Sequence, residues 1–428
     1  MHSRTKRLLT GAMLMLLAIA AATGLGASKA AAASQHRAVS VHKITACGYV
    51  AHAAGMYELT SNVTDAGSGV CIELSANDIT LNLDGHTITG TGTDTCIGVQ
   101  APGTLVNDSI VGGTKKKPTM TATLTGCGLG VVSVGTSGMS ASHLKIVAPA
   151  TVGVDAQYAG GANLNNINVP LQSNSAPGIL LQSGADNIVT KSMVDNNGTA
   201  ASFLAISETG DMFTYDTAND TYSSSGNTTD GFIDVSGARN TWSHDTAKGN
   251  LDGFYFVESG TGTVTATYDT ATGSSANANS HGFFVLAAFA IDNPASPFHT
   301  LISHNTATGF QSGFYDESGG ASAASEKWTN NTAHGYSEYG FFVDYATDDT
   351  MTGNVADANP AGKKYAGGTT YGFFVNNVGP GFAFRTFADN QAYDSQYGFV
   401  STTGVVIGGK GNVAKRNEFN TYRVEITG

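Results

Sequence analysis

Hydrophobic and polar residues alternate over short stretches along most of the chain, as in GFFVD at residues 340–344. Such segments run for about four to six residues between Gly, Asn or Asp, and this pattern predicts β-strands separated by tight turns. Amphipathic patterns long enough for helices are missing, which excludes helical solenoids of the tetratricopeptide or armadillo type. The 54 glycines and the charged fraction of only 13% agree with an all-β protein rich in turns.

Two short phrases alternate strictly along the C-terminal half. The first is Asn/Asp-x-Ala, which begins at Asp216, Asp245, Asp269, Asn305, Asn331, Asn354, Asn390 and Asn412. The second is Gly-Phe, which begins at Gly231, Gly253, Gly282, Gly313, Gly340, Gly372 and Gly398. A period of about 28 residues with variable loops indicates a solenoid.

A coil of about 22–30 residues with three short strands favours a parallel β-helix over a propeller, whose blades need four strands and a closed ring. Each strand would pair with its equivalent about 4.8 Å along the axis. We expect Ala at a tight corner, Phe in the interior, Asn side chains bonded to the next coil, and Gly to permit re-entry into a strand. Weaker copies extend the array from about residue 70 to near 420, as roughly 11–13 coils. The segments SSANANS, DNPASPF and NPAGKKYAGG should protrude as loops.

Residues 1–33 are predicted to be a signal peptide. Arg4, Lys6 and Arg7 precede an apolar segment, and small residues near Ala33 offer a cleavage site. A retained membrane anchor is the alternative, and no later segment is apolar enough to span a bilayer. We therefore expect a secreted, extracellular or periplasmic protein, with an N-terminal cap and first strands at 34–75 and the β-helix at 76–428.

Charge argues against one class of partner. The chain carries a net charge of −12, and removing residues 1–33, with four basic and no acidic residues, leaves 17 basic and 33 acidic residues, or −16. Binding to nucleic acid through bulk charge is therefore not expected.

The four cysteines, Cys47, Cys71, Cys96 and Cys127, all lie in the first third of the chain. An even number in an exported protein predicts two disulfides, and their spacing does not match a zinc site. Of the three connectivities we favour the sequence-local one, Cys47–Cys71 with Cys96–Cys127. These bonds would staple the N-terminal end of the array.

Residues 47–90, CGYV to DGHTITG, resemble the start of secreted bacterial right-handed parallel β-helix repeat proteins, and units such as NNTAHGYSEYGFFV look like their coil repeat. This pectin-lyase-like superfamily includes carbohydrate-binding proteins and sugar hydrolases. The chain is also similar to the repeat domain of copper-site maturation proteins of nitrous oxide reduction. The resemblance implies a right-handed parallel β-helix and a polysaccharide or cell-surface glycan as partner. The matching residues are structural, and the local signatures of pectate lyases and polygalacturonases are missing.

The column before the repeated Gly holds three candidate catalytic residues on consecutive coils, Asp230, Asp252 and His281. Neighbouring coils would place them about 5 Å apart. Two carboxyl groups that close raise the pKa of one of them, as general acid–base catalysis requires, and with the imidazole they could instead bind a divalent cation. The alternative is a structural role, because turns favour Asp, Ser and His.

The Gly-Phe strands also predict a binding stripe. The Phe directly after each Gly should face the core, so the residue after it should face outward. An exposed aromatic stripe could stack on sugar rings, and the alternative is cover by loops or a partner chain. Asp234 and Asp316 fall at nominally inward positions, which predicts a bulge or an early strand end there. The candidate substrate-binding residues are Tyr255, Phe284, Tyr315, Phe342 and Phe374.

Three acidic residues follow the stripe, Glu258, Glu317 and Asp344. The resemblance implies a calcium-assisted uronate site, because lyases of the superfamily pair calcium-binding carboxylates with a Lys or Arg base. Basic residues are sparse on these coils. His244 and His304 lie two coils apart with Tyr268 between them, which does not suggest a shared metal.

The hypothesis is a secreted β-helix protein that binds or processes extracellular polysaccharide, as a lyase, hydrolase or epimerase if it is catalytic. The alternative is a non-enzymatic structural or adhesive cell-surface protein. Copper maturation ranks third, because Met and His do not cluster as a soft-metal site would. A basic residue beside Asp230, Asp252 and His281 would favour an enzyme, and an uninterrupted aromatic stripe would favour binding.

Overall fold

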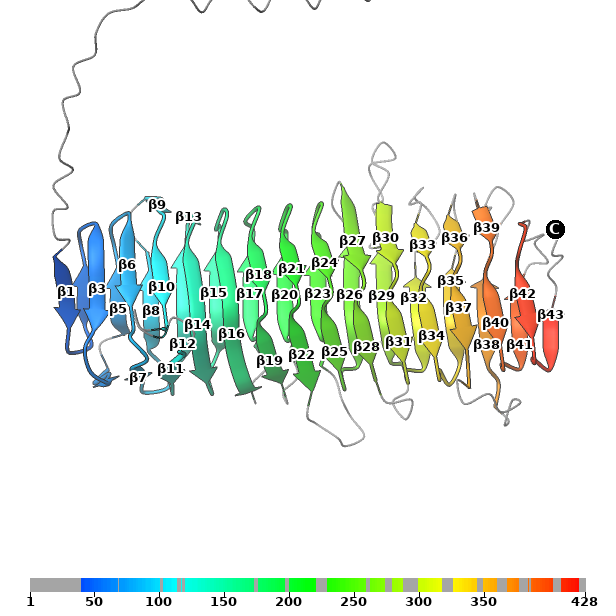
Figure 1. Ribbon diagram of the computed structural model, residues 1–428, viewed down its shortest axis with the longest axis horizontal. Coiled ribbons are helices and arrows are strands. Elements are labelled where there is room, and N and C mark those ends of the chain that lie inside the picture. Colours follow the sequence, from blue (N-terminus) through cyan, green and yellow to red (C-terminus); the bar gives the residue numbers. More distant parts are fainter. Residues whose placement is uncertain are drawn as a thin grey trace, which may run out of the picture. The chain divides into compact units, whose positions relative to one another are not determined.

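The computed structural model describes residues 40–422 except for residues 68, 101–102, 114–116, 118–119, 173–175, 197–199, 221–228, 259–261, 274–278, 288–298, 318–325, 345–348, 360–367, 377–383, 385 and 403–408. Every regular element in these ranges is a β-strand (Figure 1). The predicted signal peptide lies outside them, as do nearly all residues of the three predicted loop segments.

The strands form three parallel ladders, which we call ladder 1, ladder 2 and ladder 3. Ladder 1 contains β1 (Val41–Ile44), β3 (Gly55–Leu59), β6 (Ile79–Asn82), β10 (Ser109–Val111), β14 (Ser140–Val147), β16 (Asn163–Gln172), β18 (Ile188–Thr190), β21 (Met212–Thr214), β24 (Thr241–Ser243), β27 (Thr263–Thr267), β30 (His299–Ser303), β33 (Lys327–Thr329), β36 (Thr350–Thr352) and β39 (Thr386–Ala388).

Ladder 2 follows ladder 1 within each coil. It contains β4 (Val63–Thr64), β7 (Thr87–Thr89), β11 (Ala122–Thr125), the second halves of β14 and β16, β19 (Met193–Asn196), β22 (Thr217–Asp220), β25 (Thr246–Lys248), β28 (Thr270–Thr272), β31 (Thr306–Thr308), β34 (Thr332–His334), β37 (Val355–Asp357), β40 (Gln391–Tyr393) and β42 (Val413–Lys415).

Ladder 3 completes the coil. It contains β2 (Tyr49–Ala51), β5 (Val70–Leu74), β8 (Thr95–Val99), β12 (Leu129–Val134), β15 (Val152–Gln157), β17 (Ile179–Gln182), β20 (Phe203–Ile206), β23 (Phe232–Val235), β26 (Asp252–Glu258), β29 (His281–Ala287), β32 (Ser312–Glu317), β35 (Tyr339–Asp344), β38 (Tyr371–Asn376), β41 (Tyr397–Ser401) and β43 (Phe419–Tyr422). Two short strands, β9 (Leu105–Val106) and β13 (Thr136–Ser137), pair with each other.

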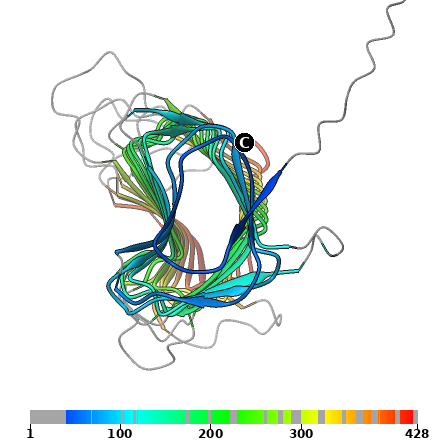
Figure 2. The same cartoon turned by 90° about the vertical axis from the view of Figure 1, so that its left-hand side faces the viewer.

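The predicted parallel β-solenoid is confirmed. Among the described residues, thirteen coils, from β3–β4–β5 to β39–β40–β41, contribute a strand to all three ladders, and partial coils flank them. In the end view of Figure 2, successive coils lie behind one another. Strands β1 to β5, within the segment predicted as a cap, already belong to the ladders. The right-handed winding stays a prediction.

A column of phenylalanine rings fills the interior behind ladder 3. Neighbouring rings stack with centroids 4.7–5.0 Å apart and are almost completely buried. The expected inward direction of the first Phe after each Gly is therefore confirmed. The column consists of Phe203, Phe232, Phe254, Phe283, Phe314, Phe341, Phe373 and Phe399.

The Asn/Asp residue of the first phrase forms the expected hydrogen-bonded ladder at the turn between ladders 1 and 2. The backbone N–H of Asn305 donates to Oδ1 of Asn331 at 3.0 Å, and the same bond joins Asn331 to Asn354. The side-chain amide of Asn331 also donates to the carbonyl of Ile302. These bonds satisfy buried backbone groups that a turn would otherwise leave unpaired.

The repeated glycines pack against the repeated alanines. A Cβ on Gly313 would lie 2.5 Å from Cβ of Ala333 and 2.8 Å from the carbonyl oxygen of Gly340. The glycines of the Gly-Phe phrase do not have positive φ angles. The expectation that conformational freedom selects Gly here is therefore wrong: the corner between ladders 2 and 3 is too narrow for a side chain opposite Ala.

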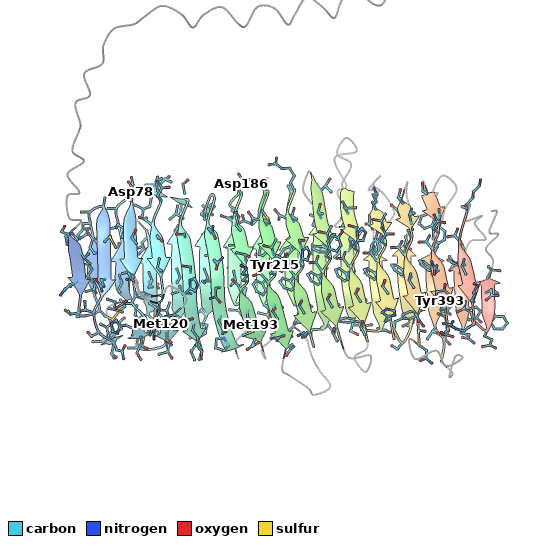
Figure 3. The ribbon with its side chains drawn as sticks, in the orientation of Figure 1. Asp78, Met120, Asp186, Met193, Tyr215 and Tyr393 are labelled. Carbon is cyan, nitrogen blue, oxygen red and sulfur yellow. A yellow bond between two sulfur atoms is a disulfide. The ribbon has the colours of Figure 1, made fainter. Side chains whose placement is uncertain are left out.

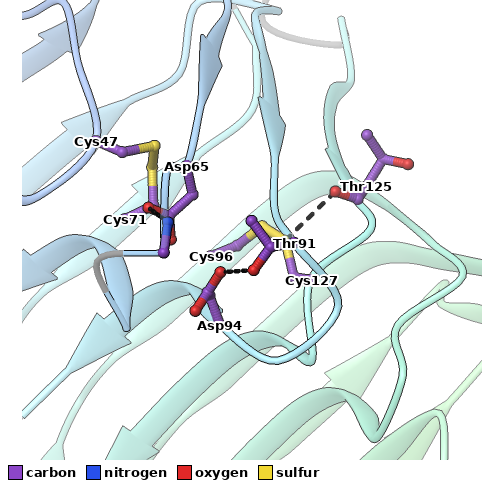
Figure 4. Close-up of a disulfide and its surroundings, with 9 residues drawn as sticks. Cys47, Asp65, Cys71, Thr91, Asp94, Cys96, Thr125 and Cys127 are labelled. Carbon is purple, nitrogen blue, oxygen red and sulfur yellow. Dashed lines mark hydrogen bonds between the residues drawn. A yellow bond between two sulfur atoms is a disulfide. The ribbon is translucent and has the colours of Figure 1, made fainter.

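Both predicted disulfides are confirmed, Cys47–Cys71 and Cys96–Cys127 (Figure 4). Each joins consecutive coils, with sequence separations of 24 and 31 residues. Closing loops of this size stabilises a fold by roughly 3–4 kcal/mol in the chain-entropy model. The bonds therefore hold together the end of the array where fewest coils pack on one another.

The described residues contain no membrane-spanning helix. Among the residues that the structure describes, no helical segment has the length and hydrophobicity that crossing a bilayer requires.

Candidate functional site

The candidate catalytic residues come together at the start of three consecutive ladder 3 strands. Asp252 and His281 are the first residues of β26 and β29 and pair directly in register, and Asp230 lies two residues before β23. Oδ1 of Asp252 accepts a hydrogen bond from the His281 backbone at 3.0 Å and lies 2.8 Å from Nδ1 of its ring. The Asp252 backbone N–H donates to Oδ1 of Asp230 at 3.3 Å.

The cluster lies in a poorly hydrated environment. Asp252 is only 6% exposed, and the His281 ring packs 4.8 Å from Phe284 and 4.6 Å from Tyr315, measured between ring centroids. Burial, and then the negative charge of Asp252, raise the pKa of Asp230 to about 7. A carboxyl group with such a pKa carries a proton over part of the neutral pH range, as a general acid must.

The candidate binding residues form one unbroken outward column on ladder 3. In-register pairing joins Tyr255 to Phe284, then to Tyr315, Phe342 and Phe374. Ring centroids of successive members lie 4.4–5.6 Å apart. The side chains are half-buried rather than openly exposed, and Phe342 is only 8% exposed. The expected outward direction is therefore observed, together with partial cover.

A second aromatic column, which sequence reasoning did not assign to binding, runs beside the first. Tyr339, Tyr371, Tyr397 and Phe419 continue the Asp252–His281 position through later coils, with centroids 5.1–5.3 Å apart. Tyr339 also meets Phe342 and Phe374 edge to face. The sequence signal for this column is the Tyr that repeatedly precedes Gly-Phe. From the sequence alone, that Tyr could equally reflect the residue preference of a turn.

Tyr315 and Tyr339 on this face are protonated at neutral pH. Burial, followed by the charges of Glu317 and Asp344, raises the pKa of Tyr315 to about 12. Burial, and then a hydrogen bond with Glu338, raises the pKa of Tyr339. These phenols can donate hydrogen bonds at neutral pH, and they are poorly suited to act as bases.

The acidic candidates do not form a metal site among the described residues. Glu317 pairs in register with Asp344, whose carboxylate accepts a bond from Asn376. Glu258 pairs with Ala287. It therefore lies one strand position beyond the column that contains Glu317, so the two side chains are not in register. Within the described part of the chain no group of three or more His, Cys, Asp or Glu residues is arranged to hold a metal ion.

The two inward aspartates show neither predicted irregularity. The pairing of β23 with β26 and of β32 with β35 continues through Asp234 and Asp316, and both side chains are buried. Asp234 accepts bonds from the Asn240 amide and the Trp242 indole N–H. The expected bulge or early strand end is wrong, because donors from Asn240 and Trp242 bond to Oδ2 of the inward Asp234 carboxylate and hold it in place.

A basic residue beside Asp230, Asp252 and His281 would favour an enzyme over a binding protein. Among the described residues, the ion pairs join His281 to Asp252 and Arg416 to Asp394, so neither Asp230 nor Asp252 pairs with Lys or Arg.

Comparison with known proteins gives similar folds only. No protein-family model matches the sequence, and no curated protein matches it significantly. Similar solved structures include the Agl-KA catalytic domain, at a TM-score of 0.47, 11% identity, 81% coverage of this chain and 62% of that domain. The chain thus spans less than two thirds of that domain's length.

Two further structures are similar. A tailspike protein of E. coli bacteriophage HK620, determined with a hexasaccharide, has a TM-score of 0.47 and 12% identity, covering 90% of this chain and 73% of that one. A pectate lyase has a TM-score of 0.37 and 14% identity, covering 77% and 84%. Identities this low concern the course of the backbone and assign no activity to this chain.

Proposed function

We propose that this is an exported protein that binds extracellular polysaccharide along the outer face of ladder 3. The observation that carries the proposal is the in-register aromatic column from Tyr255 to Phe374, next to the Asp230–Asp252–His281 cluster. Aromatic rings offer apolar faces to sugar rings, and protonated phenols donate hydrogen bonds to sugar hydroxyls. Two disulfides agree with an oxidising, extracytoplasmic location.

The cluster supports a second, catalytic proposal. Asp230, with its pKa raised to about 7, would act as general acid on a glycosidic oxygen. Asp252, fixed by the His281 imidazole, would supply the second carboxylate that glycoside hydrolysis requires. A hydrolase is therefore favoured over a lyase, because no Lys or Arg pairs with these carboxylates among the described residues. In the non-enzymatic alternative, the same groups only stabilise the coil.

The first test is a panel of polysaccharides: polymannuronate, polygalacturonate, and neutral α- and β-glucans. We expect retarded migration of the protein in gels containing at least one of them. Release of reducing ends from that polysaccharide, abolished in Asp230→Asn while retardation persists, would support hydrolysis. Retardation without release of reducing ends would support binding without catalysis. The absence of both retardation and product would overturn the proposed function.

A further inference from the structure

A separate column of rings lies at the turn between ladders 1 and 2. Tyr215, His244, Tyr268 and His304 occupy one position in four consecutive coils, directly before the buried Asn/Asp ladder. Their ring centroids lie 4.8, 5.2 and 4.9 Å apart, with interplanar angles of 20–26°. Figure 3 labels Tyr215, near the middle of that view. We call these four residues the turn column.

The turn column is exposed and flanked by hydroxyl groups. Tyr215 and Tyr268 are 58% and 54% exposed and both histidines are exposed, although each ring stacks on its neighbours in the column. One row of hydroxyls precedes the column in ladder 1, and a second row follows it in ladder 2. The rows are Thr214, Ser243, Thr267 and Ser303, and Thr217, Thr246, Thr270 and Thr306.

The backbone at this turn does not call for bulky residues. Tyr215, His244, Tyr268 and His304 all have φ angles of 59–61°, in the left-handed region that is unfavourable for a bulky residue such as Tyr and that His adopts more readily. Later coils place Asn330 and Gly353 at the same position, the residue types that this conformation favours. The two tyrosines are therefore the members of the turn column that this backbone conformation favours least, and residues kept in an unfavourable conformation are candidates for a functional role.

We propose that the turn column is a second polysaccharide-binding site, distinct from the face of ladder 3. Coils advance by about 4.8 Å, close to the advance per residue of an extended pyranose chain, so successive sugars would meet successive rings. The exposed ring edges would pack against apolar sugar faces. The partly exposed threonines of the two rows would bond to sugar hydroxyl groups, whereas Ser303 is only 8% exposed and Ser243 already accepts a bond from Thr267. A protein or lipid partner would not need matched hydroxyl rows on both sides of an aromatic strip.

This inference rests on the proposed function, and one experiment separates the two. Cellohexaose, laminarihexaose and hexamannuronate are titrated calorimetrically into the wild type. His244→Asn/Tyr268→Asn removes two rings while placing at both positions a residue that the turn favours. Tyr158→Asn is the matched control, because Tyr158 is 64% exposed and has a φ of 51° at a different turn. Tyr255→Leu/Phe374→Leu alters ladder 3.

We expect two sites per chain in the wild type and in Tyr158→Asn, and one site in each double variant. The lost site should bind at least tenfold more weakly. The midpoint of thermal unfolding of His244→Asn/Tyr268→Asn should be unchanged or higher, since its turns are relieved. A single site that only the ladder 3 variant removes would overturn the second site and leave the proposed function standing. A single site that only the turn-column variant removes would support the turn column and overturn the ladder 3 proposal. Absence of binding in the wild type would overturn both.

Discussion

At the residue scale, buried carboxyl groups in the Asn/Asp ladder make stability depend on pH. Asp216, Asp245 and Asp269 lie in consecutive coils and are each 1% exposed. Burial raises the pKa of Asp245 to about 7. Burial, and then the charge of Asp245, raise the pKa values of Asp216 and Asp269 well above the ordinary range.

The raised pKa values determine whether the stability of the protein rises or falls with pH. A carboxyl group whose pKa is higher in the folded than in the unfolded chain holds its proton more tightly after folding. Its stabilising contribution is complete below about pH 4, the unfolded pKa, and is lost as pH rises through the folded value. The protein should therefore lose stability between about pH 4 and pH 7, and further above it.

Asp269→Asn tests this account, because the next coil already has Asn305 at the same place, bonded through Oδ1 to the N–H of Asp269. We expect a midpoint of thermal unfolding several degrees higher at pH 8 and little change at pH 4, as the amide needs no proton. The midpoint is measured from pH 4 to pH 8 by circular dichroism. A lower midpoint at pH 8 would show that the carboxylate itself is the favoured form.

At the element scale, the corner between ladders 2 and 3 explains why the two sequence phrases alternate. The Ala of one phrase lies opposite the Gly of the other, at separations that leave no room for another methyl group. The Gly of one coil packs against the Ala of the following coil, so the corner needs both residues for successive coils to stack.

Gly313→Ala should therefore destabilise the coil by about 1–3 kcal/mol, as overpacking does. Gly160→Ala is the matched control, because its Cβ would meet nothing within 4 Å. Urea unfolding of both variants gives the comparison. Equal stabilities would mean that the corner can relax around a methyl group.

The same elements show what sequence can predict. The period, the strands and the phenylalanine interior follow from local patterns, because the coils of the C-terminal half repeat the same two phrases. The disulfide pairing was one of three connectivities, and the structure has the sequence-local one. The inward position of Asp234 could not be predicted, since its partners Asn240 and Trp242 belong to the next turn and strand. The position of the turn column can be identified in the sequence, because its members directly precede the Asn/Asp-x-Ala phrase. The left-handed backbone conformation of these residues and the exposure of their rings could be found only from the structure.

At the scale of the whole array, the proposed catalytic cluster and the proposed binding column lie on one face, that of ladder 3. The Asp230–Asp252–His281 cluster lies at the start of the aromatic columns, and His281 packs directly on Phe284 and Tyr315. A polysaccharide chain lying along the stacked coils would reach both. Weak contacts at several successive coils would together raise the overall affinity for the polysaccharide.

The most direct measurement is the gel retardation of Phe284→Leu/Tyr315→Leu in the polysaccharide that retards the wild type most, with Tyr158→Leu as the matched control. We predict that the ladder 3 variant loses most of the retardation while remaining folded by circular dichroism, and that the control keeps it. A folded ladder 3 variant that is retarded as strongly as the wild type would contradict the claim that this face binds polysaccharide.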